Sequence, residues 1–290
     1  MFCNSKRAKF TASIAGSHMH VREAGAGDAV LLGHSYLWDG EMWRPQMEML
    51  AGRYRVFAPD LWGHGGSGPL PAGTTMRDLA EHHLLLMDRM KIRRFAVVGL
   101  SVGAMWAAEL ALMAPDRVAG VALINSALTP EPEPTRARYD ALLRTVEAAG
   151  CVPLPVAEAV GQLFFSPAQE ERSPRLMADF GARLLGWHPE RLLDSIVPLG
   201  KLIFGREDRL AAVGALRMPR LVIASGEDRS RTIAEGKAMA SAMDAEFVAL
   251  PRAGHIASLE EPDPLSPHLM RWLERAFGPP VEPPIPLWPY

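Results

Sequence analysis

One serine stands in a sequence context that favours chemistry. Gly99-Leu100-Ser101-Val102-Gly103 fits the pattern G-x-S-x-G. It lies between an apolar run at 95–100 that predicts a strand and a run at 102–113 that predicts a helix. A sharp strand-to-helix turn holds such a serine in a strained backbone conformation, and the crowded backbone requires glycine on either side. Because the turn exposes the hydroxyl and the helix N-terminus is positive, we predict that Ser101 is a nucleophile.

A serine hydroxyl needs a neighbouring base to act as a nucleophile at neutral pH. Of nine histidines, His255 is the best placed, since it follows Gly254 on the loop after the last predicted strand, 246–250. A loop in that position lies at the carboxyl edge of the sheet, where Ser101 is also expected. We therefore predict that His255 is the general base.

The third group should be a carboxylate that orients the imidazole and stabilises the imidazolium. Asp228 stands in the turn after the predicted strand 220–224. Glu227 is the competing carboxylate, which we interpret as a solvated neighbour. The turn after the preceding strand offers Asn125 and Ser126 but no carboxylate, which favours Asp228.

An oxyanion needs two backbone N–H donors. One is expected from Val102, directly after the nucleophile. The other is expected from the loop 33–39, with Tyr36 as the donor. Tyr36 and Trp38 could also form walls of a substrate pocket, with packing on the core as the alternative for both.

The elements that must position these residues alternate between strands and helices. A hairpin is expected around Gly16, followed by strands and helices whose order predicts a parallel sheet with helices on both faces. The expected strands are 10–14, 19–23, 29–32, 54–58, 95–100, 118–125, 220–224 and 246–250, and the expected helices of this layer are 41–50, 75–90, 102–113, 232–243 and 264–277.

The alternation stops at a proline-rich departure, 130–134, and only helices are expected from there to about residue 217. We therefore divide the chain into an α/β core, residues 1–130 and 218–290, and a helical lid, residues 131–217. The lid is rich in apolar residues, so Phe164 and Leu184 could line an apolar substrate pocket. The bland alternative is that they only hold the lid on the core. The tail 279–290 is expected to be extended.

Composition excludes several classes of function. The net charge of −2 provides no basic field for nucleic acid or anionic lipid, and no apolar run is long enough to span a membrane. The two cysteines, Cys3 and Cys151, form neither a disulfide framework nor a thiolate metal site, and no signal peptide is evident near the start. A reducing compartment, and hence a cytoplasmic location, is expected.

No cofactor or metal is expected either. His18-x-His20 and His82-His83 come without carboxylates or cysteines at ligand spacing. The glycines of 63–68 lack the Lys-Ser/Thr of a phosphate-binding loop.

These motifs, in this order, resemble the α/β-hydrolase superfamily, in particular its esterase-like members with a helical lid. The resemblance covers about residues 10–278 and rests on His34 to Tyr36, Asp60 to Gly68, Gly99 to Gly103, Gly226 to Asp228 and Gly254-His255. It implies the α/β-hydrolase fold and the chain order nucleophile, acid, histidine. It also implies a structural rather than a catalytic role for Asp60 to Gly68. Relatives usually have His-Gly where this chain has His34-Ser35.

The resemblance implies a serine hydrolase that cleaves a carboxylic ester or lactone with an apolar part. Ser101 at the nucleophile position argues against haloalkane dehalogenases and epoxide hydrolases, which place a carboxylate there. A C–C bond hydrolase or a cofactor-free perhydrolase would use the same triad, and a hydrolase-fold ligand receptor would turn over slowly. The motifs do not separate these alternatives, and the oligomeric state stays open.

Overall fold

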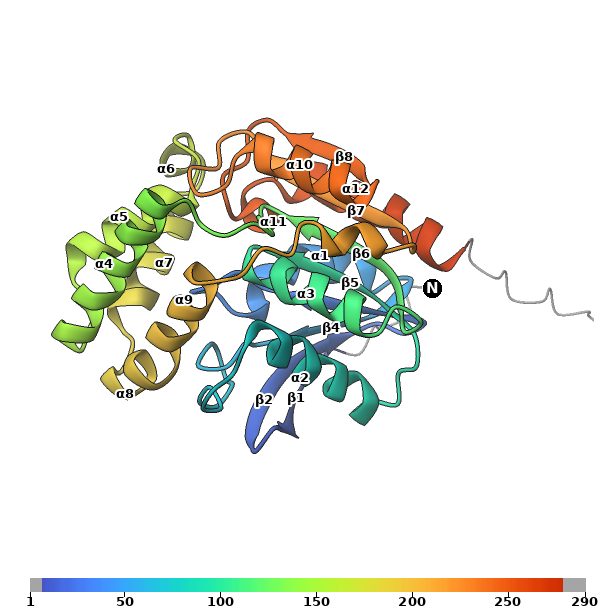
Figure 1. Ribbon diagram of the computed structural model, residues 1–290, viewed down its shortest axis with the longest axis horizontal. Helices are drawn as coiled ribbons and strands as arrows, with labels where there is room; N and C mark the ends of the chain where they lie inside the picture. The colour runs from blue at the N-terminus through green and yellow to red at the C-terminus, as the bar shows by residue number, and fades with distance from the viewer. Residues whose placement is uncertain (1–6, 279–290) are drawn as a thin grey trace, which may run out of the picture.

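The computed structural model describes residues 7–278, which contain one eight-stranded sheet in the order β1-β2-β4-β3-β5-β6-β7-β8 (Figure 1). Strands β3 to β8 run parallel, while the β1–β2 hairpin adds to the edge through antiparallel pairing of β2 with β4. The strands are β1 (Arg7–Ile14), β2 (Ser17–Ala24), β3 (Asp28–Gly33), β4 (Tyr54–Pro59), β5 (Phe95–Leu100), β6 (Val118–Ile124), β7 (Arg220–Ser225) and β8 (Glu246–Leu250).

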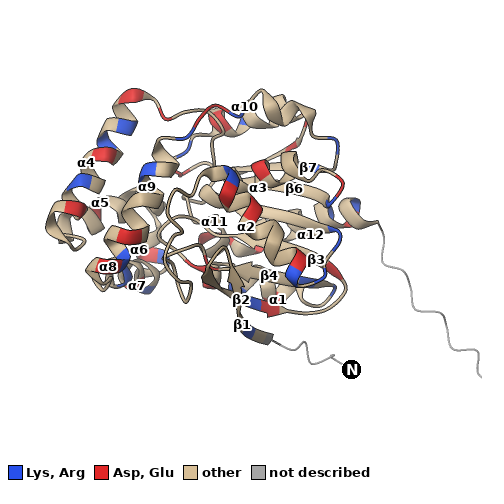
Figure 2. Ribbon diagram, turned by 60° about the horizontal axis from the view of Figure 1, so that its bottom comes forward, with Lys and Arg blue, Asp and Glu red and all other residues tan. Residues whose placement is uncertain are grey.

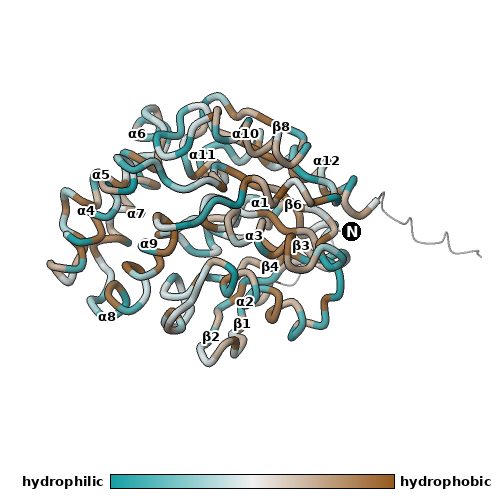
Figure 3. Tube along the Cα trace, in the orientation of Figure 1, coloured by the Kyte–Doolittle hydropathy of each residue, from teal (hydrophilic) through white to brown (hydrophobic). Residues whose placement is uncertain are grey.

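The central strands are apolar along their whole length because both faces of the sheet are covered. Every residue of β5 and β6 is buried, and the hydropathy of the residues along the chain can be followed in Figure 3. Continuous apolar runs of this kind are typical of parallel sheets between two helical layers. The predicted α/β fold with a mostly parallel sheet is confirmed.

Two groups of helices flank the sheet. In one group α2 packs on α3, and in the other α1 packs on α12 and α11 (Figure 1). The helices of these layers are α1 (Arg44–Leu50), α2 (Met76–Arg89), α3 (Val102–Met113), α10 (Ile233–Met243), α11 (Ala257–Glu260) and α12 (Pro262–Phe277). Thr75 and Thr232 begin α2 and α10 with capping boxes, so their sequences fix where these helices start.

A run of helices separates β6 from β7 and lies beyond one end of the sheet (Figure 1). We refer to residues 133–204 as the α4–α9 segment. Its helices are α4 (Glu133–Ala149), α5 (Leu154–Phe164), α6 (Gln169–Arg172), α7 (Pro174–Leu185), α8 (Pro189–Arg191), the π-helical turn η2 (Leu192–Ile196) and α9 (Val197–Phe204). A short 3-10 turn, η3 (Ala212–Ala215), precedes β7.

Most expected elements differ from the observed ones by one or two residues at their ends, and two differ more. The helix expected at 41–50 is split into a 3-10 turn, η1 (Gly40–Trp43), and α1. Pro45 explains the split, since it has no N–H and its ring clashes with the carbonyl four residues earlier, so an α-helix can only begin close to it. Strand β1 begins at Arg7, three residues before the expected start. The tail 279–290 and Cys3 lie outside the described residues.

In the part of the chain that the structure describes, charges of both signs are interspersed, and Figure 2 shows no strand or helix there with a continuous basic stripe. Among residues 7–278, no helix is long and apolar enough to cross a membrane.

Candidate active site

Ser101 occupies a strained turn between β5 and α3. Its φ of 59° and ψ of −120° lie outside the regions that side chains normally adopt. The glycines are required by close packing: a Cβ on Gly99 would lie 2.2 Å from the carbonyl carbon of Gly103, and one on Gly103 would lie 2.2 Å from the carbonyl oxygen of Gly33. The turn thus places the hydroxyl at the positive end of α3, as the sequence predicted.

His255 and Asp228 come together at the carboxyl edge of the sheet. Nδ1 of His255 lies 2.8 Å from Oδ2 of Asp228, and both side chains are almost completely buried. Since the carboxylate only accepts, Nδ1 donates to it, so in the neutral imidazole Nε2 is the basic nitrogen. Ser101 and His255 line the same cavity, so the structure brings all three predicted residues into one site. Glu227 is exposed.

The other carboxylate oxygen of Asp228 is fully engaged by the residues that follow it. Oδ1 accepts from the backbone N–H groups of Ser230 at 2.8 Å and Arg231 at 3.0 Å, and from the Ser230 hydroxyl at 2.9 Å. The Ser230 oxygen also lies 2.9 Å from Nδ1 of His255. These donors fix the plane of the carboxylate and present Oδ2 to the imidazole.

The loop that carries His255 is held from two sides. The backbone N–H of His255 donates to the carbonyl of Phe164, at the end of α5, at 2.9 Å. Its carbonyl accepts from the Asn125 side-chain amide, also at 2.9 Å. The Phe164 ring lies 4.9 Å from the imidazole. Gly254 is required here, because a Cβ would come within 2.4 Å of the backbone nitrogen of Ser166.

The two backbone N–H groups predicted to bind an oxyanion have no protein acceptor among the described residues. Within residues 7–278, neither the N–H of Tyr36 nor that of Val102 donates to a protein group. Val102 opens α3, where the first N–H groups have no intrahelical partner. The Tyr36 hydroxyl donates to the carbonyl of Ile196 at 2.7 Å, and burial raises the pKa of this phenol well above its ordinary value.

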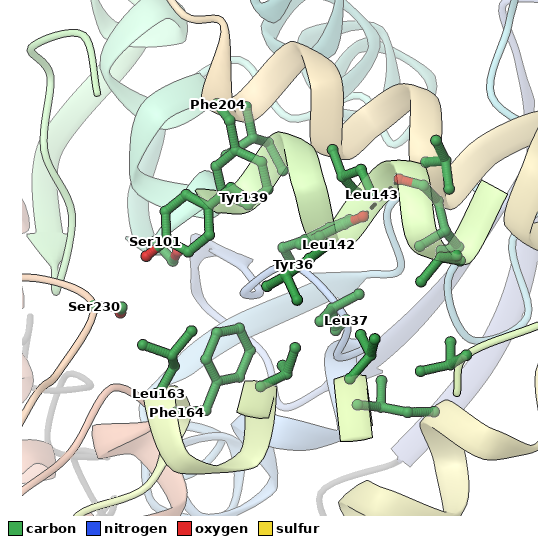
Figure 4. A pocket seen from close by; sticks show the side chains of 18 of the residues that line it. Tyr36, Leu37, Ser101, Tyr139, Leu142, Leu143, Leu163, Phe164, Phe204 and Ser230 are labelled. Carbon is green, nitrogen blue, oxygen red and sulfur yellow. Dashed lines mark hydrogen bonds between the residues drawn. The ribbon is translucent and has the colours of Figure 1, made fainter. Parts of the chain in front are cut away.

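A cavity of about 90 Å³ runs from Ser101 between α4, α5 and α9 (Figure 4). Most of its lining is apolar, and the residues with polar groups include Ser101, Ser230, Arg231, His255, Tyr36 and Tyr139. The apolar lining includes Leu37, Leu142, Leu143, Val146, Leu163, Phe164, Leu184 and Phe204. Such a cavity accommodates an apolar ligand group next to a few polar atoms.

The predicted substrate-contact residues divide into two kinds. Phe164 and Leu184 line the cavity. Trp38 is not among the residues that line it. Its ring stacks on Phe180 at 4.9 Å, and Arg183 covers it from 5.5 Å. The Trp38 ring therefore packs against the α4–α9 segment.

A buried charge cluster joins the loop of Asp228 to both ends of the α4–α9 segment. The Glu131 carboxylate, just before α4, accepts from Arg206, just after α9, at 2.7 Å, and from Arg231. Glu235 lies 3.2 Å from Arg231. Burial alone would raise the pKa of Glu131, but the hydrogen bond and charge of Arg231, with Arg206, hold it below its usual value.

Within residues 7–278, no group of three or more His, Cys, Asp or Glu side chains is arranged to hold a metal ion. His82 accepts from the Trp62 indole N–H at 3.0 Å, and His83 stacks on Trp106. Both are therefore engaged in packing.

The sequence matches the family model described as "alpha/beta hydrolase fold" over residues 28–262. The chain belongs to this family. The match spans the sheet from β3, the α4–α9 segment and the loops of Ser101, Asp228 and His255. Relatives and structural neighbours named as a putative carbamate hydrolase, enol-lactonases and an esterase support the statement that the protein is a hydrolase of this fold.

Two relatives with similar sequences carry names that describe different activities. A putative carbamate hydrolase RutD of Klebsiella pneumoniae subsp. pneumoniae is 28% identical over 229 residues, covering 77% of this chain and 83% of the relative. A dihydrolipoyllysine-residue acetyltransferase component of the acetoin cleaving system of Cupriavidus necator is 41% identical over 106 residues. That alignment covers 37% of this chain, and this chain spans only 28% of the relative's length.

Two solved structures are similar over nearly their whole length. The enol-lactonase from Burkholderia xenovorans LB400 has a TM-score of 0.81 and 28% identity, covering 91% of this chain and 99% of that chain. A thermophilic esterase from Thermogutta terrifontis has a TM-score of 0.81 and 26% identity, covering 93% and 99%.

Sequence reasoning missed two residues that shape the site. Ser230 follows Asp228 by two positions, the spacing at which an Asp side chain bonds its own downstream backbone, and this pattern could have been recognised. Asn125 was considered only as a missing carboxylate. Its amide instead joins the ends of β6 and β7 to the His255 loop, and no local pattern indicates so distant a set of partners.

Proposed function

We propose that the protein is a serine hydrolase that cleaves carboxylic esters or lactones through an acyl-enzyme on Ser101. The observation that carries this proposal is the 2.8 Å bond between His255 and Asp228 in the cavity that Ser101 also lines. A hydroxyl, a neutral imidazole and an orienting carboxylate form the set that activates serine for acyl transfer. The esterase and the enol-lactonase with similar structures support it.

In the first half of the reaction, the Ser101 oxygen attacks the carbonyl carbon while its proton passes to Nε2 of His255. The N–H groups of Tyr36 and Val102 stabilise the oxyanion of the tetrahedral intermediate. The intermediate collapses, and the alcohol leaves with the proton from Nε2. Asp228 keeps the other nitrogen protonated and stabilises the imidazolium.

In the second half, water replaces the alcohol. His255 removes a proton from the water, whose oxygen adds to the acyl carbon, and the same donors hold the second oxyanion. Ser101 then leaves, recovering the proton from Nε2, and the free acid departs. For a lactone, acid and alcohol remain parts of one product.

We further propose that residues 131–217 act as a lid over the site, and that residues 1–130 and 218–290 form the core. Phe164 and Leu184 come from this segment and line the cavity with Ser101. Their apolar surfaces would bind an apolar acyl or alcohol group and exclude water.

The test is a panel of p-nitrophenyl esters from acetate to octanoate, with aliphatic lactones, an aryl carbamate and a C–C bond hydrolase substrate in parallel. The proposal predicts turnover of the esters or lactones well above background, with the lowest KM for an acyl chain longer than acetate. Turnover of the C–C substrate alone, or tight binding of all compounds without turnover, would contradict it.

A further inference from the structure

Two loops beside the site are joined by a reciprocal pair of hydrogen bonds. The first loop, 33–39, contains Tyr36, and the second, 60–68, lies against it. The backbone N–H of Leu61 in the second loop donates to Nε2 of His34 in the first, at 2.7 Å. The backbone N–H of Leu37 in the first donates to Nε2 of His64 in the second, at 3.1 Å. Each loop thus supplies one histidine that accepts from the other loop.

The remaining ring nitrogens define the protonation state of both histidines. Nδ1 of His34 lies 2.7 Å from the carbonyl oxygen of Ser35, and Nδ1 of His64 lies 2.9 Å from that of Trp62. Because carbonyls only accept and N–H groups only donate, both rings are neutral with the proton on Nδ1. Both are completely buried, and burial lowers the pKa of His34 and lowers that of His64 to about 3.

These bonds fix the two peptide units on either side of Tyr36. The Ser35 carbonyl accepts from His34 and from the Trp38 N–H, at 3.2 Å. In a trans peptide the C=O and N–H point in opposite directions, so the N–H of Tyr36 is turned away from His34. The next N–H, that of Leu37, is held by His64, and Leu37 itself has a φ of 69° that few side chains tolerate.

The second loop is anchored well enough to act as a fixed support. The buried carboxylate of Asp60 accepts from the backbone N–H groups of Gly40 at 2.8 Å and Gly66 at 2.9 Å, and from the side chains of Arg22 and His20. A Cβ on Gly65 would collide with this carboxylate at 2.1 Å. The loop that carries His64 therefore has little freedom to shift.

We propose that His64, together with His34, is a positioning residue that aims the Tyr36 N–H at the oxyanion. This inference rests on the proposed function. The 60–68 loop would support the site by holding the loop that contains Tyr36. His64 does not touch the reacting atoms. It removes the alternative orientations of the Tyr36 and Leu37 peptides, so that the donor is in place before charge develops on the substrate oxygen.

Three variants separate positioning from a packing role. In His64→Gln the Oε1 atom stands near the place of Nε2 and can still accept from Leu37. His64→Leu keeps a similar volume but has no acceptor. His83→Leu is the matched control, since His83 is also buried, has a pKa lowered by burial to about 3 and bonds through Nδ1 to the carbonyl of Leu79 on its own helix.

The measurements are kcat, KM and the inhibition constant of a trifluoromethyl ketone, which forms a tetrahedral adduct with the nucleophile. For His64→Leu we expect kcat and the affinity for the ketone to fall together by about 10²-fold, with KM changed less than threefold. His64→Gln should recover most of both losses. His83→Leu should lower Tm and leave the kinetic constants within threefold of the wild type. Equal kinetic losses in the two leucine variants, or a loss confined to KM, would overturn the proposal.

A second measurement tests the pairing independently of ester turnover. In ¹⁵N-histidine spectra of the resting protein, His64 should show the Nδ1–H form and should not titrate between pH 8 and 4. His64 titrating near pH 6.5 would overturn the proposal even if the enzyme hydrolyses esters. If no ester or lactone is turned over but His64 behaves as expected, the proposed function fails while the pairing of the loops stands.

Discussion

Nδ1 of His255 lies 2.8 Å from Oδ2 of Asp228. The other carboxylate oxygen, Oδ1, accepts only from Ser230 and Arg231 among the donors that the structure describes. The carboxylate is therefore oriented by its own loop before it meets the imidazole. If Asp228 is the acid that orients His255, removing the charge of its carboxylate should lower the activity.

Asp228→Asn should lower kcat by about 10³–10⁴, since the amide cannot stabilise the imidazolium and favours the wrong tautomer. Glu227→Gln is the matched control, because Glu227 is the adjacent carboxylate and is exposed. We expect it to change kcat less than threefold. Steady-state kinetics on one ester decide the ranking, and the reverse order would move the acid to position 227.

Ser230→Ala should lower kcat by about 10-fold, because it removes one donor to Asp228 and the oxygen close to Nδ1 of His255. Ser230→Thr keeps the hydroxyl and should retain more of the activity. If both variants have the same kcat, the hydroxyl does not orient the pair.

The far part of the cavity should control chain length. Val146 lies near the end of α4, which runs away from the sheet in Figure 1, and it lines the cavity. Val146→Phe should raise KM for octanoate esters at least fivefold more than for acetate esters, because the added ring fills the space of a longer chain. Leu154→Phe, at an exposed position of α5, is the control. An equal rise for all chain lengths would show that Val146 serves only packing.

The buried charge cluster should be essential for stability. Glu131→Gln leaves the guanidinium groups of Arg206 and Arg231 without a full counter-charge in a buried place, and we expect the free energy of unfolding to fall by about 3–5 kcal/mol. Glu147→Gln is the control, since Glu147 pairs with Lys201 on the surface. It should cost less than about 1 kcal/mol. Urea unfolding measures both, and similar losses would contradict the expected role of burial.

Stability should decline in mild acid. Burial lowers the pKa of His64 and of His83 to about 3 in the folded protein, while an unfolded histidine titrates near 6.5. Below pH 6.5 the unfolded chain thus binds protons that the folded one does not. Each such histidine lowers the free energy of unfolding by about 1.4 kcal/mol per pH unit, down to about pH 3. His83→Leu should reduce the slope of the free energy of unfolding against pH below pH 6.5, by up to one proton or about 1.4 kcal/mol per pH unit. An unchanged slope would contradict this.

The parts of the molecule predictable from sequence were those set by local patterns. The glycines around Ser101, the apolar runs of β5 and β6 and the capping boxes of α2 and α10 each specify structure within a few residues. The Tyr36 contact with Ile196 and the stacking of Trp38 on Phe180 depend on how the α4–α9 segment docks. Long-range packing of this kind leaves no periodic signal in the sequence.

The central claim is that Ser101 is the nucleophile, and the most direct measurement combines Ser101→Ala with active-site labelling. Peptide mass spectrometry of the wild type treated with a fluorophosphonate should find the adduct on Ser101 alone. The variant should take no label, keep its Tm within a few degrees and lose about 10⁴–10⁶ of kcat. A folded Ser101→Ala protein that keeps more than a tenth of wild-type activity, or an adduct on another serine, would contradict the account.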